Sequence, residues 1–275
     1  MTIIRAVLSI IAAGLLACFG VAVYVFTLLK RRPPQTLYMH RSVEPDFLPL
    51  DQIPPRLIEL IIENEDKNFY THPGYDIEAI RKARQLNRRK KRIVWGASTI
   101  TQQLAKNLYL RFRKSYLRKL AELLIAVHLE RTLGKKRILE MYLNTSYFGN
   151  GAYGVVSAAQ FYFHKRVRDL SLNQMVMLTA LLPVPTIGNP IQHPKEFELL
   201  RNKYLAKAAK NGRPSFSQAE VEAMRSYGID SLDPELRKPD DFTRNYPQTI
   251  PMINERFGPF SDAGDKHPTA PQNDP

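Results

Sequence analysis

Residues 6–29 form a run of twenty-four amino acids without a charged side chain. A helix rises about 1.5 Å per residue, so a run of this length crosses the roughly 30 Å hydrocarbon core of a bilayer. The alternative is a cleavable signal peptide, because residues 15–18 (Leu-Leu-Ala-Cys) resemble a lipoprotein cleavage box. The apolar run continues for eleven residues past Cys18, however, so processing there would leave a hydrophobic stub. We therefore expect residues 1–32 to be an uncleaved transmembrane anchor.

The composition leaves room for one folded domain besides the anchor. With 275 residues and 44% apolar amino acids, the chain can bury one ordinary hydrophobic core. The single cysteine, Cys18, lies within the apolar run, which excludes a disulfide framework and a cysteine-based metal site. From the positions of the prolines we expect an extended linker at 33–55, a catalytic domain at 56–205 and a proline-rich, loosely structured C-terminal extension at 206–275.

Apolar residues in the catalytic domain recur at helical spacing, whereas the alternation of apolar and polar residues that is typical of strands is scarce. The helical sets are Leu57, Leu60 and Ile61; Ile100, Leu104 and Leu108; Leu120, Leu124 and Val127; and Met175, Leu178 and Leu182. This spacing predicts a mainly α fold.

Positive charge is concentrated in one part of the chain. Between Ala79 and Ala121 there are fourteen Lys or Arg residues and no Asp or Glu, and their number equals the net charge of +14. Such a field favours an anionic partner: a nucleic acid, an anionic membrane surface or a phosphorylated substrate. A basic helix face that is simply solvated is the alternative. A strand of nucleic acid would call for interleaved aromatic residues, and there are none between Ala79 and Ile93.

A first group of polar residues closes the first apolar helix of the domain. Glu65 and Asp66 are adjacent carboxylates, and His72 and a Pro-Gly turn follow them. A carboxylate at this position is held by its helix and can face a groove. Most Glu-Asp pairs are solvated surface, and a single His is more often a structural hydrogen-bonding group, so this pattern alone does not define a site.

A second group lies on a helix that we expect to begin at Ser98. Positions 99, 102, 103 and 106 share one face of this helix, and the apolar positions 100, 104 and 108 share another. The polar face carries Thr99, Gln102, Gln103 and Lys106. Neutral hydrogen-bonding groups with one cation suit a sugar or a phosphate, although an exposed polar helix has the same pattern.

The third group is Arg118, Lys119 and Glu122. Arg118 and Glu122 are four residues apart, so they face the same way on a helix, as an ordinary surface ion pair also does. Residues 135–144 then lead into a glycine-rich turn at 148–154, where the glycines imply tight backbone geometry. A phosphate-binding loop of the type GxxxxGK[ST] does not occur, and we do not expect this turn to bind a nucleotide.

Taken in order, these segments resemble the domain of glycosyltransferase family 51, the peptidoglycan glycosyltransferases, which occur as monofunctional enzymes and as the first domain of bifunctional penicillin-binding proteins. The resemblance spans about 58–190 and rests on Glu-Asp-x-x-Phe-x-x-His-x-Gly, Gly-x-Ser-Thr-Ile-x-Gln-Gln-Leu-x-Lys-Asn, Arg-Lys-x-x-Glu and Ile-Leu-Glu-x-Tyr-Leu-Asn. Departures are small: Ala97 replaces a common glycine, and His164 replaces the usual Gly or Asn before Lys165. The Ser-x-x-Lys and Lys-Thr-Gly motifs of a transpeptidase are absent, so a monofunctional biosynthetic peptidoglycan transglycosylase is expected.

The resemblance implies a lysozyme-like fold with a small hydrophobic jaw that dips into the membrane, and an inverting polymerisation of lipid II. In that reaction the 4-hydroxyl of one lipid II attacks the anomeric carbon of the growing chain, and undecaprenyl diphosphate leaves. By motif match Glu65 is the general base and Glu122 lies on the donor side, near the diphosphate. The residues expected to bind substrate are Asp66, His72, Ser98, Thr99, Gln102, Gln103, Lys106, Asn107, Arg118, Lys119, Lys135, Arg137, Glu140 and Asn144.

The sequence requires no cofactor, and Glu122 is the candidate ligand if a divalent cation, Mg²⁺ or Mn²⁺, sits at the diphosphate. The implied partners are lipid II, the growing lipid-linked glycan, the membrane and other cell-wall synthesis proteins, with no nucleic acid. The implied location is the inner (cytoplasmic) membrane, single-pass, with the catalytic domain on the extracytoplasmic side. The cations at 30–32 outnumber Arg5 and the amino terminus, which by itself would place the domain in the cytoplasm. Two other functions stay open: a lysozyme-like glycan-cleaving enzyme and a membrane-anchored protein that binds an anionic polymer.

Overall fold

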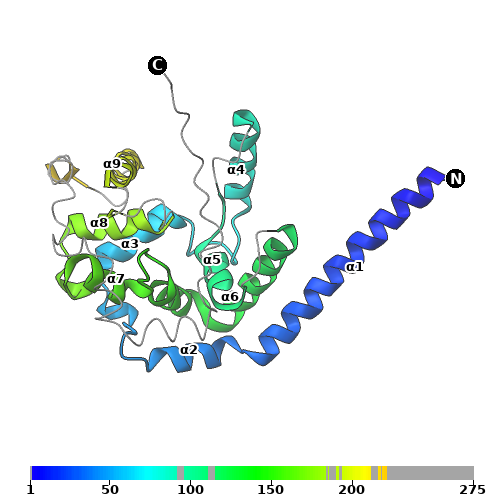
Figure 1. Ribbon diagram of the computed structural model, residues 1–275, viewed down its shortest axis with the longest axis horizontal. Coiled ribbons are helices and arrows are strands. Elements are labelled where there is room, and N and C mark those ends of the chain that lie inside the picture. The colour runs from blue at the N-terminus through cyan, green and yellow to red at the C-terminus, as the bar shows by residue number, and fades with distance from the viewer. Residues whose placement is uncertain are drawn as a thin grey trace, which may run out of the picture. The chain divides into compact units, whose positions relative to one another are not determined.

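The computed structural model describes residues 2–91, 96–110, 115–183, 185, 190–191, 194–211, 216–217 and 219–221. Within these residues the chain consists of α-helices and short 3-10 helices joined by loops, and no strand is present (Figure 1). One isolated antiparallel bridge joins Tyr147 and Tyr153. The mainly α fold expected from the apolar spacing is therefore confirmed.

Helix α1 (Thr2–Arg31) contains the whole charge-free run. It is the one helix in the described part of the chain that is long and apolar enough to cross a membrane, and none of its 18-residue apolar window is buried in the protein. Exposed apolar surface of this extent is stable in lipid and unstable in water. The C-terminal end of α1 meets the folded domain, where Val25 is buried and the Tyr109 hydroxyl donates to the Arg32 carbonyl oxygen at 3.0 Å.

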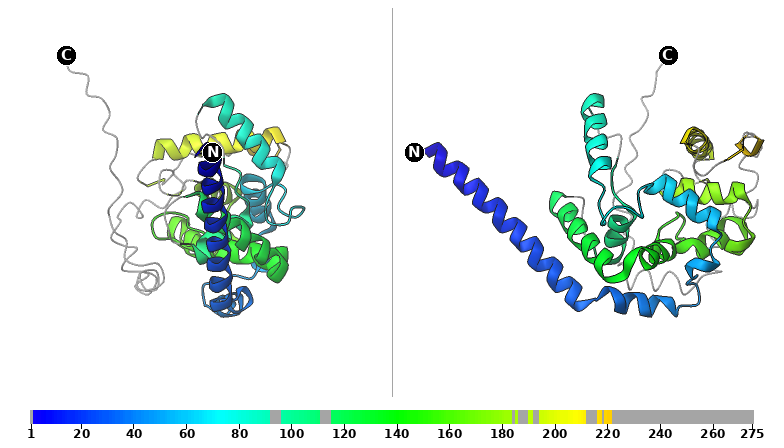
Figure 2. Two further views of the ribbon diagram at one scale, coloured as in Figure 1. Left: turned by 90° about the vertical axis from the view of Figure 1, so that its right-hand side faces the viewer. Right: turned by 180° about the vertical axis from the view of Figure 1, so that it is seen from behind.

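The segment after α1 is more regular than an extended linker. Helix α2 (Pro34–Ser42) occupies the first part of the predicted linker 33–55, and the 3-10 helix η1 (Leu50–Gln52) follows it. Proline argues against a helix interior, but Pro34 occupies the first turn, where a backbone N–H has no intrahelical partner to lose. Helix α2 lies against α6, which Figure 2 shows from two further sides.

Five helices build the core of the domain: α3 (Pro55–Glu65), α5 (Ile100–Tyr109), α6 (Tyr116–Thr145), α7 (Gly154–Phe163) and α8 (Leu172–Leu181). Helix α5 lies along α6, α8 packs on α3, and α7 contacts both α6 and α8. The predicted apolar sets on α3 and α5 enter this core, since Leu57, Leu60 and Leu104 have no exposed surface. Each such side chain stabilises the fold by about 1.5–3 kcal/mol. The set on α6 differs, because Leu124 remains 37% exposed.

Helix α6 is interrupted at Gly134. This glycine has φ 72° and ψ 165°, so residues 116–133 and 135–145 form two helical halves that meet at a kink. Positive φ is a conformation that glycine adopts without steric cost. Directly after the kink, the Lys135 ammonium donates to Glu130 Oε1 at 2.7 Å and to the His72 carbonyl oxygen at 2.7 Å, so it bridges the two halves and the loop after α3.

The glycine-rich turn connects α6 to α7. Residues 149–154 have the spacing Gly-x-Gly-x-x-Gly, but they follow a helix and not a strand, so the context of a dinucleotide-binding turn is missing. The glycines serve close packing: a Cβ on Gly149 would lie 2.6 Å from the Pro185 carbonyl oxygen, and one on Gly154 would lie 2.8 Å from that of Asn144. The turn is therefore a structural connection, and η2 (Val167–Asp169) follows α7.

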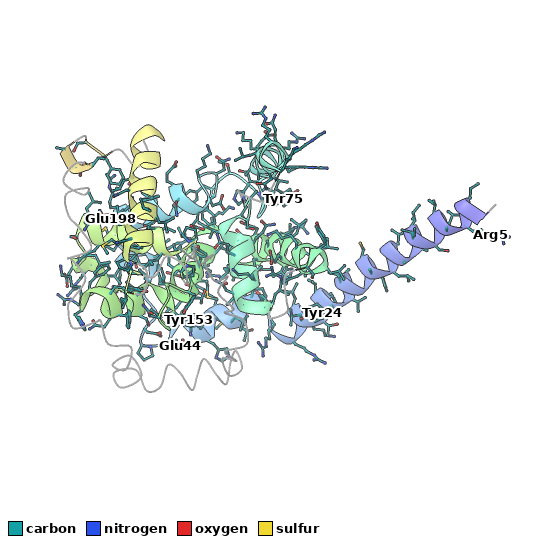
Figure 3. The ribbon with its side chains drawn as sticks, turned by 45° about the horizontal axis from the view of Figure 1, so that its top comes forward. Arg5, Tyr24, Glu44, Tyr75, Tyr153 and Glu198 are labelled. Atoms are coloured by element: carbon teal, nitrogen blue, oxygen red, sulfur yellow. The ribbon has the colours of Figure 1, made fainter. Side chains whose placement is uncertain are left out.

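Helix α4 (Ile77–Lys90) carries much of the concentrated positive charge. Asp76 caps its N-terminus by accepting a hydrogen bond from the Ala79 N–H at 2.8 Å, and Lys91 ends it in the left-handed conformation. Arg84, Arg88 and Arg89 are exposed along it. In Figure 3 the side chains of this helix spread outward near the labelled Tyr75.

Helix α9 (Pro194–Asn211) crosses the predicted domain limit at residue 205. It packs on α8 and α3, and the Tyr204 hydroxyl donates to the Leu60 carbonyl oxygen at 2.9 Å. The folded domain thus continues to the end of this helix. Further on, Ser217 and Glu220 form a capping box, with the Glu220 N–H donating to Ser217 Oγ at 3.2 Å and the Ser217 N–H donating to Glu220 Oε2 at 2.8 Å. The predicted extension beyond residue 221 lies outside the described residues.

Candidate active site

Glu65 is the last residue of α3, and neutral amide groups hold its carboxylate. The Gln103 Nε2 group on α5 donates to Glu65 Oε2 at 2.7 Å, and the Asn64 Nδ2 group donates to Oε1 at 3.0 Å. The Tyr142 hydroxyl on α6 donates to Gln103 Oε1 at 3.3 Å, which fixes the orientation of the amide. Burial, with a contribution from Glu65, raises the pKa of Tyr142 well above its usual value, so this hydroxyl keeps its proton. Three helices therefore orient the Glu65 carboxylate.

Asp66 and His72 point inward and tie the loop after α3 to the start of α5. His72 Nε2 lies 2.9 Å from both Asp66 oxygens, and the Gly74 N–H donates to His72 Nδ1 at 3.1 Å, which puts the ring proton on Nε2. Asp66 Oδ2 also accepts from the Ile100 N–H at 2.9 Å. A carboxylate at a helix N-terminus is stabilised by the unpaired N–H groups there. Both side chains are buried, so they organise the backbone beside Glu65.

Thr99 and Gln102 form a capping box at the start of α5. The Gln102 N–H donates to Thr99 Oγ1 at 3.1 Å, and the Thr99 N–H donates to Gln102 Oε1 at 3.1 Å. The Thr99 hydroxyl donates in turn to the Gly74 carbonyl oxygen at 2.7 Å. The polar face predicted for this helix is therefore divided: Thr99 and Gln102 are buried in the cap, whereas Gln103 reaches Glu65. Asn107, one turn further along α5, is half-buried.

Glu122 lies in the first half of α6 and is surrounded by cations. Although the residue is only 3% exposed, its Oε1 lies 3.0 Å from Arg118 Nη1 and its Oε2 lies 2.7 Å from Lys119 Nζ. Lys119 Nζ also donates to Ser98 Oγ at 2.7 Å, which links α6 to the residues before α5. A buried carboxylate needs such partners. One negative and two positive charges leave this cluster with a net positive charge.

Lys106 lies within electrostatic reach of both glutamates. Although its side chain is exposed, atoms packed around the ammonium desolvate it and lower the pKa of Lys106 below the usual 10.5. Glu122 and Glu65 oppose this change, and the cations Arg118 and Lys119 reinforce it. An arriving anion would restore the favourable environment of the ammonium. Helix α5 thus presents one lysine between a carboxylate held by amides and a carboxylate held by cations.

The other predicted substrate-binding residues have different surroundings. Lys135 is held by Glu130 and by the His72 carbonyl oxygen, and its ammonium lies 4.6 Å from the centre of the Phe69 ring. The Arg137 guanidinium lies over the ring of Tyr38, 5.1 Å from its centre. Glu140 and Asn144 are buried and bind the backbone that follows α2. In this structure these four residues contact other parts of the protein.

Asn64 and Tyr142 belong to the Glu65 site but were not predicted from the sequence. The Asn64 amide donates directly to the Glu65 carboxylate, and the Tyr142 hydroxyl acts on Glu65 indirectly, by holding the Gln103 amide. Tyr142 had a detectable signal, because a tyrosine that is buried usually needs a partner for its hydroxyl and this one stands among apolar residues in the motif at 135–144. Asn64 had none beyond its position next to Glu65.

The residues near Glu122 do not fit a metal centre. Among the described residues there is no group of three or more His, Cys, Asp or Glu side chains that could hold a metal ion. Mg²⁺ and Mn²⁺ prefer several oxygen ligands, whereas the neighbours of Glu122 are an arginine and a lysine. Positive charge at this place opposes a cation, and we derive no reaction step through a metal.

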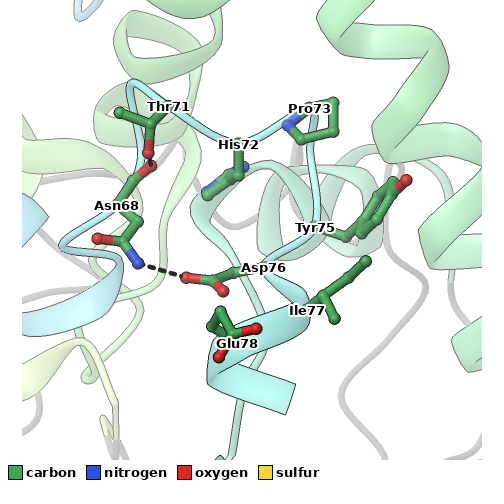
Figure 4. A pocket seen from close by; sticks show the side chains of 8 residues that line it. All are labelled: Asn68, Thr71, His72, Pro73, Tyr75, Asp76, Ile77 and Glu78. Carbon is green, nitrogen blue, oxygen red and sulfur yellow. Dashed lines mark hydrogen bonds between the residues drawn. The ribbon is translucent and has the colours of Figure 1, made fainter. Parts of the chain in front are cut away.

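An open hollow of about 340 Å³ lies at the base of α4 (Figure 4). The Asn68 side chain donates to Asp76 Oδ2 at 2.7 Å across it, and the Thr71 hydroxyl donates to the Asn68 carbonyl oxygen at 2.9 Å. Its lining consists of Asn68, Thr71, His72, Pro73, Tyr75, Asp76, Ile77 and Glu78. Neither Glu65 nor Glu122 lines this hollow, so it is separate from the candidate active site.

Comparisons with known proteins bear on the family of this chain. The sequence model of the family described as "Transglycosylase" matches residues 34–209. Penicillin-binding protein 1A of Aquifex aeolicus is 46% identical over 166 residues, which make up 60% of this chain and 23% of that protein. Penicillin-binding protein 4 of Bacillus subtilis is 36% identical over 211 residues, 77% of this chain and 32% of that protein. The crystal structure of penicillin-binding protein 1A from Haemophilus influenzae aligns with 77% of this chain and 21% of that chain, with a TM-score of 0.39 and 20% identity.

The chain spans between a fifth and a third of the length of the curated relatives it matches. The family match itself begins at α2 and ends within α9, so it covers more than half of the chain. It also includes both glutamates and every residue predicted to bind substrate. This chain therefore belongs to the transglycosylase family, glycosyltransferase family 51.

Proposed function

We propose that this protein is a peptidoglycan glycosyltransferase that polymerises lipid II into glycan strands. The observation that carries the proposal is the contrast between two carboxylates within electrostatic reach of one lysine. Glu65 is oriented by neutral amide groups, and a carboxylate oriented in this way can serve as a general base. Glu122 is held by Arg118 and Lys119, a cluster whose positive charge suits a phosphate.

Each carboxylate then has one task in an inverting transfer. The 4-hydroxyl oxygen of the acceptor lipid II forms a bond to the anomeric carbon of the growing chain, and Glu65 takes the hydroxyl proton. The bond between the anomeric carbon and the diphosphate oxygen breaks, and undecaprenyl diphosphate leaves with the bonding electrons. Arg118, Lys119 and Lys106 stabilise the negative charge that develops on it. Glu122 holds the first two cations in place.

The location follows from the substrate. Lipid II is a membrane lipid, and we propose that the protein is anchored in the inner membrane by α1 with its catalytic domain on the extracytoplasmic side. The exposed arginines of α4 and the exposed side chains of Ile77 and Ile80 on the same helix support contact with an anionic lipid surface. The cations at the end of α1 can bind the same surface, which reconciles them with this orientation. Other cell-wall synthesis proteins are proposed partners.

The test is an incubation of the purified full chain with labelled lipid II in detergent or vesicles. We expect a ladder of glycan products that a Glu65→Gln variant does not form. A lysozyme-like enzyme would instead shorten preformed glycan and leave lipid II unchanged, so both substrates belong in the same experiment. Cleavage of glycan without polymerisation would overturn the proposal.

A further inference from the structure

Glu140 and Asn144, near the end of α6, are fully engaged with the segment that joins the anchor to the domain. Both oxygens of Glu140 are used there: Oε2 accepts from the Tyr38 hydroxyl on α2 at 2.6 Å, and Oε1 accepts from the Leu50 N–H at 2.7 Å. The residue is 4% exposed. Hydrogen bonds to a charged group contribute about 1.5–3 kcal/mol each, so these two bonds hold the segment against α6.

Asn144 binds the same segment in the manner of a paired strand. Its Oδ1 accepts from the Leu48 N–H at 2.8 Å, and its Nδ2 donates to the Leu48 carbonyl oxygen at 2.9 Å and to the Glu140 carbonyl oxygen at 2.8 Å. The amide oxygen and both amide N–H groups of Asn144 are thus hydrogen-bonded within the protein. Arg41 adds a third attachment, because its Nη2 donates to the Asn144 carbonyl oxygen at 3.2 Å while it pairs with Glu44.

The segment is also attached at its other end. The Tyr109 hydroxyl, on α5, donates to the carbonyl oxygen of Arg32, directly after α1. Helix α5 carries Gln103 and Lys106, and α6 carries Glu122 as well as Glu140. The connection from anchor to domain is therefore bonded to the same two helices that present the candidate active-site residues.

We propose that Glu140 and Asn144 are positioning residues that keep this connection rigid, so that the anchor holds the active site at a fixed height above the membrane. The expected effect on the reaction rate rests on the proposed function, whereas the rigidity of the connection does not. A lipid-linked substrate presents its reacting atoms at a set depth near the membrane surface. An enzyme on a flexible tether would sample many heights, whereas a bonded connection aligns the site with the substrate.

The native cysteine allows a direct measurement of this rigidity. Cys18 is the only cysteine of the chain and is exposed on α1, so a spin label there can be paired with one at Glu59→Cys, an exposed position on α3. Distances between the two labels are measured on the full chain in nanodiscs. The variant to compare combines Tyr38→Phe with Asn144→Ala. Tyr204→Phe is the control, because it also removes one tyrosine hydroxyl bond but lies on α9.

We expect one narrow distance distribution for the parent protein and for Tyr204→Phe, and a broad one for the double variant. Loss of these bonds lets the connection sample several positions on α6, so the distances between the two labels spread over a wider range. The double variant should also lose at least about tenfold in rate on lipid II embedded in the nanodisc. It should keep its rate on a short-chain analogue presented in micelles.

Each result decides the matter. An unchanged distance distribution in the double variant would overturn the proposal, and so would an equal loss of rate on both substrates, because that indicates general damage to the domain. If the parent protein polymerises neither substrate, the proposed function fails. The distance measurement still tests the rigid connection in that case.

Discussion

At the scale of single residues, the two glutamates of this site, Glu65 and Glu122, have different surroundings. Amide groups from Asn64 and Gln103 orient Glu65 without adding charge, whereas Arg118 and Lys119 neutralise Glu122. The amide donors fix the direction of the Glu65 carboxylate and add no charge, whereas the two cations beside Glu122 give that cluster a net positive charge. The two different tasks that we propose for these glutamates rest on this difference between their neighbours.

Replacing Glu65 by Gln should remove the base and keep the shape of the site. We expect polymerisation to fall by about 10²-fold to 10⁴-fold, the usual contribution of general-base catalysis. The affinity for a diphosphate-containing inhibitor should stay within a small factor of the parent, because the base acts only in the transition state. Steady-state rates and inhibitor titrations on both proteins measure this. A variant that polymerises within about tenfold of the parent would remove Glu65 from this role.

Replacing Glu122 by Gln should have a different signature. Arg118 and Lys119 lose the charge that holds them, and the two cations then repel each other. We expect the rate and the inhibitor affinity to fall together, by about tenfold or more for a lost charge-assisted contact of 1.5–3 kcal/mol. The same assays serve here. Unchanged inhibitor affinity would show that Glu122 does not organise the diphosphate site.

Lys106 gives the site a dependence on pH. Desolvation lowers the pKa of this lysine below its usual 10.5, so the ammonium is lost at a lower pH than for a free lysine. If the charged form binds a diphosphate, as we propose, inhibitor affinity should decline as the pH rises through this lowered pKa. Lys106→Arg, which keeps its charge, should shift the decline to higher pH. Identical pH profiles of the two proteins, from inhibitor titrations between neutral and alkaline pH, would contradict this assignment.

At the scale of the helices, Gly134 separates the half of α6 that carries Glu122 from the half that carries Glu140. Gly134→Ala should destabilise the fold by about 1–3 kcal/mol, because φ 72° with ψ 165° is a backbone conformation that only glycine adopts readily. Gly96→Ala is the matched control: a Cβ at either glycine meets no atom within 4 Å, but Gly96 does not have a positive φ. Thermal unfolding followed by circular dichroism in detergent compares the two. Equal melting temperatures would mean that the kink carries no backbone constraint.

The helices of the core could be predicted from the sequence, because apolar spacing reports burial directly. Leu57, Leu60 and Leu104 show this. Helix α2 could not, since its prolines suggested an extended chain and its stability comes from contacts with α6, which are distant in sequence. The same limit applies to the site. The pattern of α5 placed Gln102 and Gln103 on one face, and only the three-dimensional contacts separate the one that caps the helix from the one that reaches Glu65.

At the scale of the whole molecule, the basic surface of α4 concerns the membrane. Replacing Arg84, Arg88 and Arg89 by Gln should remove attraction to anionic lipid of about 1 kcal/mol per residue at low salt. We expect the parent protein to polymerise faster in nanodiscs that contain anionic lipid, and the triple variant to lose this acceleration. Changing Arg131, Arg166 and Arg168 instead gives the same net charge from exposed positions outside α4. Equal behaviour of both triple variants would indicate an effect of net charge alone.

The length of α1 links catalysis to a property of the lipid itself. A helix of 30 residues is about 45 Å long, whereas the hydrocarbon core is about 30 Å thick, so α1 must tilt or stand partly outside the core. In a thinner or thicker bilayer it adjusts by a different tilt. Because Tyr109, Glu140 and Asn144 bond the end of this helix and the following segment to the domain, the adjustment passes to the active site. We therefore expect bilayer thickness, set by the chain length of the surrounding lipids, to change the rate of the polymerisation that we propose for this protein.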